Sequence, residues 1–132
     1  MTEQLISADV VVVAYPMYNF SMPASVKAWF DSVMLKGKTW DAKDGSYAGL
    51  MKGKKALVLV ASGGFYGKEP MASWEHALSL GKTEFQFMGY SDVRGVLAEG
   101  MNAGDENKMS VLTKSLRQVQ DIAREWYGNG KA

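Results

Sequence analysis

Two short stretches of the chain are apolar at every position, a pattern typical of strands buried inside a parallel sheet. Residues 10–14 read Val-Val-Val-Val-Ala, and residues 56–61 read Ala-Leu-Val-Leu-Val-Ala. A strand with one face in water alternates apolar and polar residues, whereas a strand covered on both faces does not. We therefore expect two central strands buried on both faces, the first starting at about Asp9. Residues 92–97 are more polar and predict a third strand towards a sheet edge.

Helices are predicted after each strand, because apolar residues there recur every three or four positions. The first helix begins near Pro23, which suits an initial helical turn; the second follows Pro70, and the third spans residues 105–127. The expected apolar stripes are, in order, Val26, Trp29, Phe30, Val33 and Met34; Met71, Trp74, Leu78, Phe85 and Met88; Met109, Leu112, Leu116, Val119, Ala123 and Trp126. This β-α-β-α-β-α order predicts an α/β layered domain, with residues 1–132 forming one domain.

Residues 37–55 lack any such periodicity and predict a long loop. Loops of this length are usually functional or locally folded. Trp40 and Tyr47 within it offer two interpretations. In the first, the aromatic side chains cover a neighbouring site. In the second, which we favour, they anchor a surface loop to the domain.

Composition narrows the classes of partner. Fifteen basic and fourteen acidic residues leave a net charge of +1, so we expect no nucleic-acid partner, which would need a basic face. The chain has no cysteine, and its single histidine, His76, is expected inside the second helix. We therefore expect no metal site.

No apolar stretch approaches the roughly 20 residues that span a bilayer, and no signal-peptide pattern is present. These features predict a soluble cytoplasmic protein without membrane contact.

Two loops that follow the apolar strands are the candidate site. Residues 16–21 and 62–67 leave the carboxyl ends of neighbouring parallel strands, where ligands bind in open α/β sheets. Glycines at 63 and 64 let main chain approach a ligand closely. Ordinary turns with aromatic packing account for these loops about equally well. We find no set of catalytic acid, base or nucleophile, which favours a protein whose chemistry comes from a cofactor.

The stretch Ala8-Asp9-Val10-Val11-Val12-Val13-Ala14-Tyr15-Pro16-Met17-Tyr18-Asn19-Phe20 resembles the flavin-contacting segment of FMN-dependent NADH azoreductases. Its continuation through residue 33 resembles the matching helix of the wider NAD(P)H quinone reductase family. Further similar segments are 49–56, Gly63-Gly64, 89–93 and Ala98-Glu99-Gly100. The resemblance extends over essentially the whole chain in the family's order.

This resemblance implies a flavodoxin-like parallel sheet with helices on both faces and an FMN-dependent NAD(P)H oxidoreductase. Such an enzyme uses NADH or NADPH to reduce quinones or azo compounds by two-electron transfer through FMN, commonly as a homodimer with the site at its interface. The implied cofactor-binding residues are Pro16, Met17, Tyr18, Asn19, Phe20, Ala61, Ser62, Gly63 and Gly64.

The chain departs from the family pattern in two ways. Ala61 and Ser62 stand where azoreductases usually have Ser-Arg before the glycine pair. The resemblance also covers only the carboxyl-terminal portion of the domain, without the first two strands and the serine-rich loop that holds the FMN phosphate in the family. An alternative function is therefore a truncated, non-enzymatic fragment that associates through its exposed apolar strand.

Overall fold

The computed structural model describes residues 1–128, in which three parallel strands form the central sheet. The strands are β1 (Val10–Pro16), β4 (Lys55–Ala61) and β5 (Asp92–Ala98), in the order β1-β4-β5. Each strand pairs with the next over its full length, from Val10 opposite Lys55 to Ala61 opposite Ala98. The predicted α/β architecture and the edge position of the third strand are confirmed.

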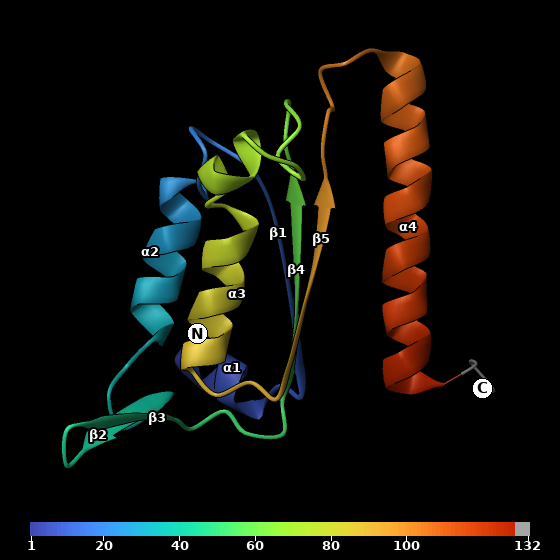
Figure 1. The fold of residues 1–132 in the computed structure, drawn as a ribbon. Coiled ribbons are helices and arrows are strands. Elements are labelled where there is room, and N and C mark those ends of the chain that lie inside the picture. Colours follow the sequence, from blue (N-terminus) through green and yellow to red (C-terminus); the bar gives the residue numbers. More distant parts are fainter. Residues whose placement is uncertain (129–132) are drawn as a thin grey trace.

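Helices lie on both faces of the sheet, as Figure 1 shows. On one face are α2 (Ala24–Val33) and α3 (Leu78–Phe87), with α1 (Thr2–Ser7) near the amino-terminal end of the strands. On the other face stands α4 (Asp105–Tyr127). The described part of the chain holds no helix long and apolar enough to cross a membrane.

The main core lies between the sheet and the pair α2 and α3. Phe30 and Phe85 are fully buried there, with ring centroids 5.2 Å apart in an edge-to-face arrangement. Val58 of the middle strand is fully buried in the same cluster. Edge-to-face pairs are favoured over stacked rings and contribute about 0.5–1.5 kcal/mol beyond burial. The predicted stripe on α2 therefore forms the centre of the core.

The second face is covered only in part. Ile122 of α4 packs against Leu57 and Val96, and the Trp126 indole Nε1 donates a 2.8 Å hydrogen bond to the Asp92 carboxylate. Towards its amino-terminal end, however, α4 leaves Leu116 62% exposed. Of the predicted stripe on this helix, Val119 and Trp126 are half-buried and Met109, Leu112, Leu116 and Ala123 are exposed, whereas the buried residue Ile122 was not part of the stripe.

The expectation that β1 is central and covered on both faces is wrong for the described chain. β1 is an edge strand, and Val12 is 56% exposed on the face that α4 leaves open. β4 is the strand with neighbours on both sides, and Ala56, Leu57, Val58 and Val60 are buried. An unbroken apolar run indicates that a strand tends to be buried. Whether it is buried depends on which other elements pack against it.

The predicted long loop over residues 37–55 is also corrected. It contains an antiparallel hairpin, β2 (Trp40–Lys43) and β3 (Ser46–Gly49), closed at Asp44 and Gly45, whose φ angles are 52° and 76°. Asp-Gly is a strong signal for this two-residue turn. Figure 1 places the hairpin at the end of the sheet opposite the loops that leave β1 and β4. It cannot cover the candidate site of its own chain.

The helix predicted after Pro70 is broken into a short 3-10 helix (Met71–Trp74) and α3. The Glu75 carboxylate accepts hydrogen bonds from the Leu78 and Ser79 main-chain N–H groups, at 2.6 and 3.1 Å, and so begins a new helix. His76 is exposed in the connection and is not inside a helix, as had been expected.

Gly81 gives α3 room to pack over β1. A Cβ atom at this position would overlap the Tyr15 hydroxyl, which donates a 2.9 Å hydrogen bond to the Ala77 carbonyl. Gly81→Ala should therefore lower the free energy of unfolding by about 1–3 kcal/mol through overpacking, despite alanine's better helix propensity. Adding Tyr15→Phe should recover part of the loss, because the overlapping oxygen is removed.

Urea unfolding of the two variants measures this coupling. Gln86→Ala, at an exposed position of the same helix, is the control and should change stability by less than about 0.5 kcal/mol. Two results would contradict the packing described. One is a Gly81→Ala variant with the same free energy of unfolding as the parent. The other is a double variant whose loss of unfolding free energy exceeds the sum of the losses of Gly81→Ala and Tyr15→Phe.

Burial raises the pKa of the Glu84 carboxyl above its ordinary 4.5, while Lys27, with Nζ 3.6 Å from Glu84 Oε1, opposes the shift. When the pKa of a carboxyl is higher in the folded state than in the unfolded chain, the folded protein becomes less stable as the pH rises through the folded-state pKa. Glu84→Gln should therefore unfold at a higher temperature than the parent at about pH 7, and the gain should vanish near pH 4. A Glu84→Gln variant that melts at the same temperature as the parent at both pH values would contradict the burial of this carboxyl.

Candidate functional site

The loop after β1 is a tight turn in an unusual backbone conformation. Asn19 and Phe20 have φ angles of 48° and 70°, in the left-handed region that bulky side chains rarely adopt. Tyr18 and Ser21 exchange main-chain hydrogen bonds across the turn, at 2.9 and 3.1 Å. The His76 N–H also donates to the Phe20 carbonyl at 2.8 Å. Strain of this kind persists only where the surroundings hold it, and it is concentrated at functional sites.

The loop after β4 is fixed by main-chain contacts to the end of β5. Ser62 N–H donates to the Ala98 carbonyl at 2.9 Å, and Gly100 N–H donates to Gly64 at 2.9 Å. A Cβ on Gly63 would overlap the Asn102 amide, so glycine is required for this close approach. Ser62 is 2% exposed and donates its hydroxyl to Gly64, so its side chain is structural.

The two predicted loops meet at one edge of the sheet. The Met17 N–H donates a 2.7 Å hydrogen bond to the Ala61 carbonyl, which extends the β1–β4 ladder one residue beyond the strands. The structure thus brings together all nine residues predicted to bind the cofactor. Pro16, Tyr18, Asn19, Phe20, Ala61 and Gly64 are exposed at this edge, while Met17 and Gly63 are partly covered.

Aromatic side chains gather around the Phe20 ring. Its centroid lies 5.3 Å from that of Trp74 and 6.1 Å from that of Tyr66, both edge-to-face. Trp74 is 52% exposed and Phe65, on the same loop as Tyr66, is 53% exposed. The edge therefore presents a cluster of partly exposed aromatic rings that could contact an apolar or aromatic ligand. Sequence analysis had placed Trp74 in a helix stripe and missed this role, because the broken helix redirects it.

Glu99 is a second residue that sequence analysis did not assign to the site. Its carboxylate Oε2 accepts hydrogen bonds from the Tyr66 and Gly67 main-chain N–H groups, both at 2.8 Å. Glu99 follows β5, whose carboxyl end lies at the same edge as those of β1 and β4. The topology alone could have marked this position, since all three parallel strands end there.

Beneath the edge, the Tyr15 hydroxyl is buried against the Ala77 carbonyl. Burial raises the pKa of Tyr15 well above its ordinary value, with smaller contributions from the Glu75 and Glu84 carboxylates. The phenol therefore stays protonated at all physiological pH values. It serves as a fixed donor that links β1 to the start of α3.

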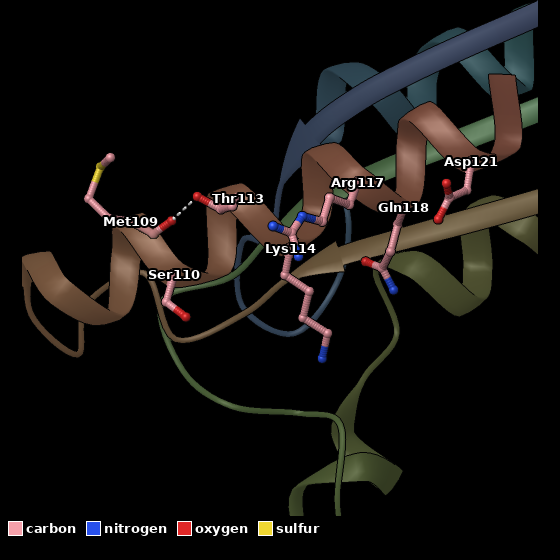
Figure 2. A pocket seen from close by; sticks show the side chains of 7 residues that line it. All are labelled: Met109, Ser110, Thr113, Lys114, Arg117, Gln118 and Asp121. Carbon is pink, nitrogen blue, oxygen red and sulfur yellow. Dashed lines mark hydrogen bonds between the residues drawn. The ribbon is translucent and has the colours of Figure 1, made fainter. Parts of the chain in front are cut away.

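A separate hollow of about 490 Å³ lies on α4 (Figure 2). All seven residues that line it belong to this one helix: Met109, Ser110, Thr113, Lys114, Arg117, Gln118 and Asp121. The Thr113 hydroxyl is engaged with the Met109 carbonyl at 2.9 Å. Because no other element forms an opposing wall, this surface offers little enclosure to a small ligand, and we assign the candidate site to the strand-end loops.

The sequence profile of a family described by its flavodoxin-like fold matches residues 2–123. The chain belongs to this flavodoxin-like family. It is 39% identical over 122 residues to an FMN-dependent NADH:quinone oxidoreductase of Legionella pneumophila, covering 92% of this chain and 59% of that protein. It is 45% identical over 119 residues to a protein of the same name from Gluconobacter oxydans, covering 88% and 59%.

Solved structures agree with this assignment. An FMN-dependent NADH-azoreductase of Bacillus anthracis in complex with FMN superimposes with a TM-score of 0.87 at 30% identity, covering 97% of this chain and 60% of that one. The flavodoxin-like fold and the resemblance to azoreductases and quinone reductases are therefore confirmed. The chain spans about three fifths of the length of these relatives.

Glu99→Ala should loosen the loop after β4, because two main-chain N–H groups lose a charged acceptor. A hydrogen bond to a charged group contributes about 1.5–3 kcal/mol, so exchange of the Tyr66 and Gly67 amide protons should accelerate at least roughly tenfold. Hydrogen exchange followed by NMR measures both residues. Glu99→Gln keeps an acceptor oxygen and should show a smaller effect, whereas unchanged exchange in both variants would contradict the contact.

Proposed function

We propose that this chain carries the flavin-ring half of an FMN site and acts in a cytoplasmic FMN-dependent NAD(P)H oxidoreductase that reduces quinones or azo compounds. The observation that carries the proposal is the strained Tyr18–Ser21 turn, fixed to the glycine turn after β4 by the Met17–Ala61 hydrogen bond. Relatives named FMN-dependent NADH:quinone oxidoreductase and a similar azoreductase in complex with FMN support it.

The residues at the edge fit the isoalloxazine ring in chemical character. Tyr18 and Phe20 offer aromatic surface, and the exposed Asn19 amide offers both donor and acceptor. The exposed main chain at Gly64 has no side chain to block a close approach. FMN, when bound, supplies the two-electron chemistry between a nicotinamide and the acceptor. The protein's part is to bind, orient and shield the ring, which agrees with the lack of a predicted acid–base pair.

We further propose that NADH or NADPH and then the quinone or azo compound use the aromatic surface around Phe20, and that two chains form a homodimer over this edge. The exposed Tyr18, Phe65 and Trp74 support both points, since clustered exposed aromatics mark ligand or protein contacts. Sedimentation of the parent and of Trp74→Ala would show whether self-association depends on this edge.

Tyr18→Ala should weaken FMN binding roughly tenfold, corresponding to about 1.4 kcal/mol, because an aromatic contact with the ring is lost. Tyr18 is 60% exposed, so the fold should be unaffected. Tyr47→Ala, at a 71% exposed tyrosine of the distant hairpin, is the matched control and should bind FMN as the parent does. Fluorescence titration with FMN measures the binding affinity. Oxidation of NADH and of NADPH in the presence of a quinone then measures the activity. A folded parent chain that neither binds FMN nor oxidises either nucleotide would contradict the proposal.

The exposed outer face of β1 favours a second candidate function. In this alternative the chain is a non-enzymatic flavodoxin-like module that associates through β1. Association of a folded chain that does not bind FMN would support this second function, and FMN binding with turnover by the chain alone would support the first.

A further inference from the structure

A hollow of about 240 Å³ lies at the strained turn after β1 and is lined by Phe20, Ser73, Trp74 and His76. We call it the Trp74 pocket. The rings of Phe20 and Trp74 form its apolar wall and meet edge-to-face, with centroids 5.3 Å apart. A cavity of about 150 Å³ is large enough to hold benzene. The Trp74 pocket therefore has room for one six-membered ring with a small substituent.

The backbone that carries the polar side of this pocket is fixed to the turn after β1. The His76 N–H donates to the Phe20 carbonyl at 2.8 Å, and the Ser21 hydroxyl donates to the His76 carbonyl at 3.5 Å. Because Glu75 begins a new helix, His76 is exposed in the connection instead of lying inside a continuous helix. The imidazole is thus held next to the Phe20 and Trp74 rings.

The pocket offers a ligand one hydrogen-bond donor and one acceptor. An imidazole has at least one N–H donor whether or not it is charged, and His76 is exposed. The Ser73 hydroxyl already donates to the Pro70 carbonyl at 3.1 Å, so its oxygen is left to accept. A ligand that matches the imidazole carries an oxygen that accepts a hydrogen bond.

The charges around the pocket favour a neutral ligand. The Glu75 carboxylate, between Trp74 and His76 in the sequence, is held by the N–H groups that begin α3. It would repel a carboxylate or phosphate group placed in the pocket. None of the lining residues is a lysine or an arginine that would offset this repulsion. A carbonyl oxygen accepts a hydrogen bond without bringing a charge, and it therefore fits the pocket better than an anionic group.

We propose that the Trp74 pocket binds a neutral ring that carries a carbonyl oxygen. The ring contacts Phe20 and Trp74, and the His76 imidazole donates a hydrogen bond to the oxygen. A ring of the same shape without the oxygen displaces water from the imidazole and gives it no partner, which costs free energy. The aromatic wall therefore provides affinity for any small ring, and His76 provides the selectivity for a carbonyl.

This inference rests on the proposed function only for the origin of the ring. Phe20 belongs both to the pocket and to the proposed flavin site. An NAD(P)H oxidoreductase of quinones meets two neutral rings with a carbonyl, the quinone and the reduced nicotinamide with its carboxamide. The carboxamide also has N–H groups, so only the nicotinamide can donate a hydrogen bond to the Ser73 oxygen.

NMR titration of the isotope-labelled chain without FMN tests the binding independently of the flavin. The probes are acetophenone and ethylbenzene, which differ by a carbonyl in place of a methylene group. Acetophenone should bind with a Kd on the order of a millimolar, as expected for a ligand of this size. It should shift the Trp74 indole N–H signal and the main-chain signals of Phe20 and His76. Ethylbenzene should bind roughly tenfold more weakly, for want of one hydrogen bond.

Three variants separate the contribution of the aromatic wall from that of the hydrogen bond. His76→Ala should weaken acetophenone binding roughly tenfold and leave ethylbenzene binding unchanged, whereas Trp74→Ala should weaken both. His76→Gln keeps an N–H donor and should recover part of the affinity for acetophenone. His76 is exposed, so its variants should melt as the parent does. Tyr47→Ala, at an exposed aromatic of the hairpin, is the control and should bind both probes normally.

Nicotinamide, used as a third probe, distinguishes the two sources of the ring. Tighter binding of nicotinamide than of acetophenone, with the difference lost in Ser73→Ala, assigns the pocket to the nicotinamide. Equal or weaker binding of nicotinamide, unchanged in Ser73→Ala, assigns it to the quinone. Either result supports a pocket for a carbonyl-bearing ring.

Three results would overturn the proposal. Acetophenone binds no better than ethylbenzene, His76→Ala leaves its affinity unchanged, or the shifted signals lie outside the pocket, for example along α4. A chain that binds FMN but not acetophenone would contradict this inference alone. A chain that binds acetophenone at His76 but does not bind FMN would contradict the proposed function and leave the pocket in place.

Discussion

The parallel ladder between β1 and β4 continues one hydrogen bond past the strands, from Met17 N–H to the Ala61 carbonyl, and the candidate site depends on this bond. It places the end of β1 beside the glycine turn at a fixed register. The positive φ angles at Asn19 and Phe20 can be held only because both ends of that turn are anchored. The β4–β5 ladder extends the same constraint to the Glu99 loop, so one edge of a short sheet positions three loops together.

The core beneath the edge restricts how this arrangement can change. Tyr15 is the last buried residue of β1, and its hydroxyl reaches the start of α3, where Gly81 leaves space for it. Glu84 on the same helix has its pKa raised by burial, although Lys27 on α2 opposes the shift. These polar contacts connect β1, α2 and α3 across the core. The strained turn is therefore held in place both by the packing of β1 against α3 and by the hydrogen-bond ladder between β1 and β4.

The strands, the final helix and the two candidate loops could be predicted from the sequence because their signals are local. Apolar runs mark β4, three–four periodicity marks α4 from Asp105 to Tyr127, and the loops follow from where the strands end. The Asp44-Gly45 turn was also a local signal, and it was overlooked because the flanking strands are short and polar. The break before α3 was harder to foresee, since it depends on Glu75 binding N–H groups that a continuous helix would have used. The exposure of Val12 and Leu116 depends on which elements pack nearby, and no single residue pattern reports that. The roles of Glu99 and Trp74 likewise arise from contacts between segments distant in the sequence.

We propose that the two loops, joined by one main-chain hydrogen bond, hold a flavin ring. Hydrogen exchange of the whole chain with and without FMN tests it most directly, because every amide reports on its own position. We expect protection to increase together at residues 17–20 and 62–64 and to stay unchanged in the hairpin at residues 40–49. Protection confined to α4, or no change in either loop at saturating FMN, would contradict it.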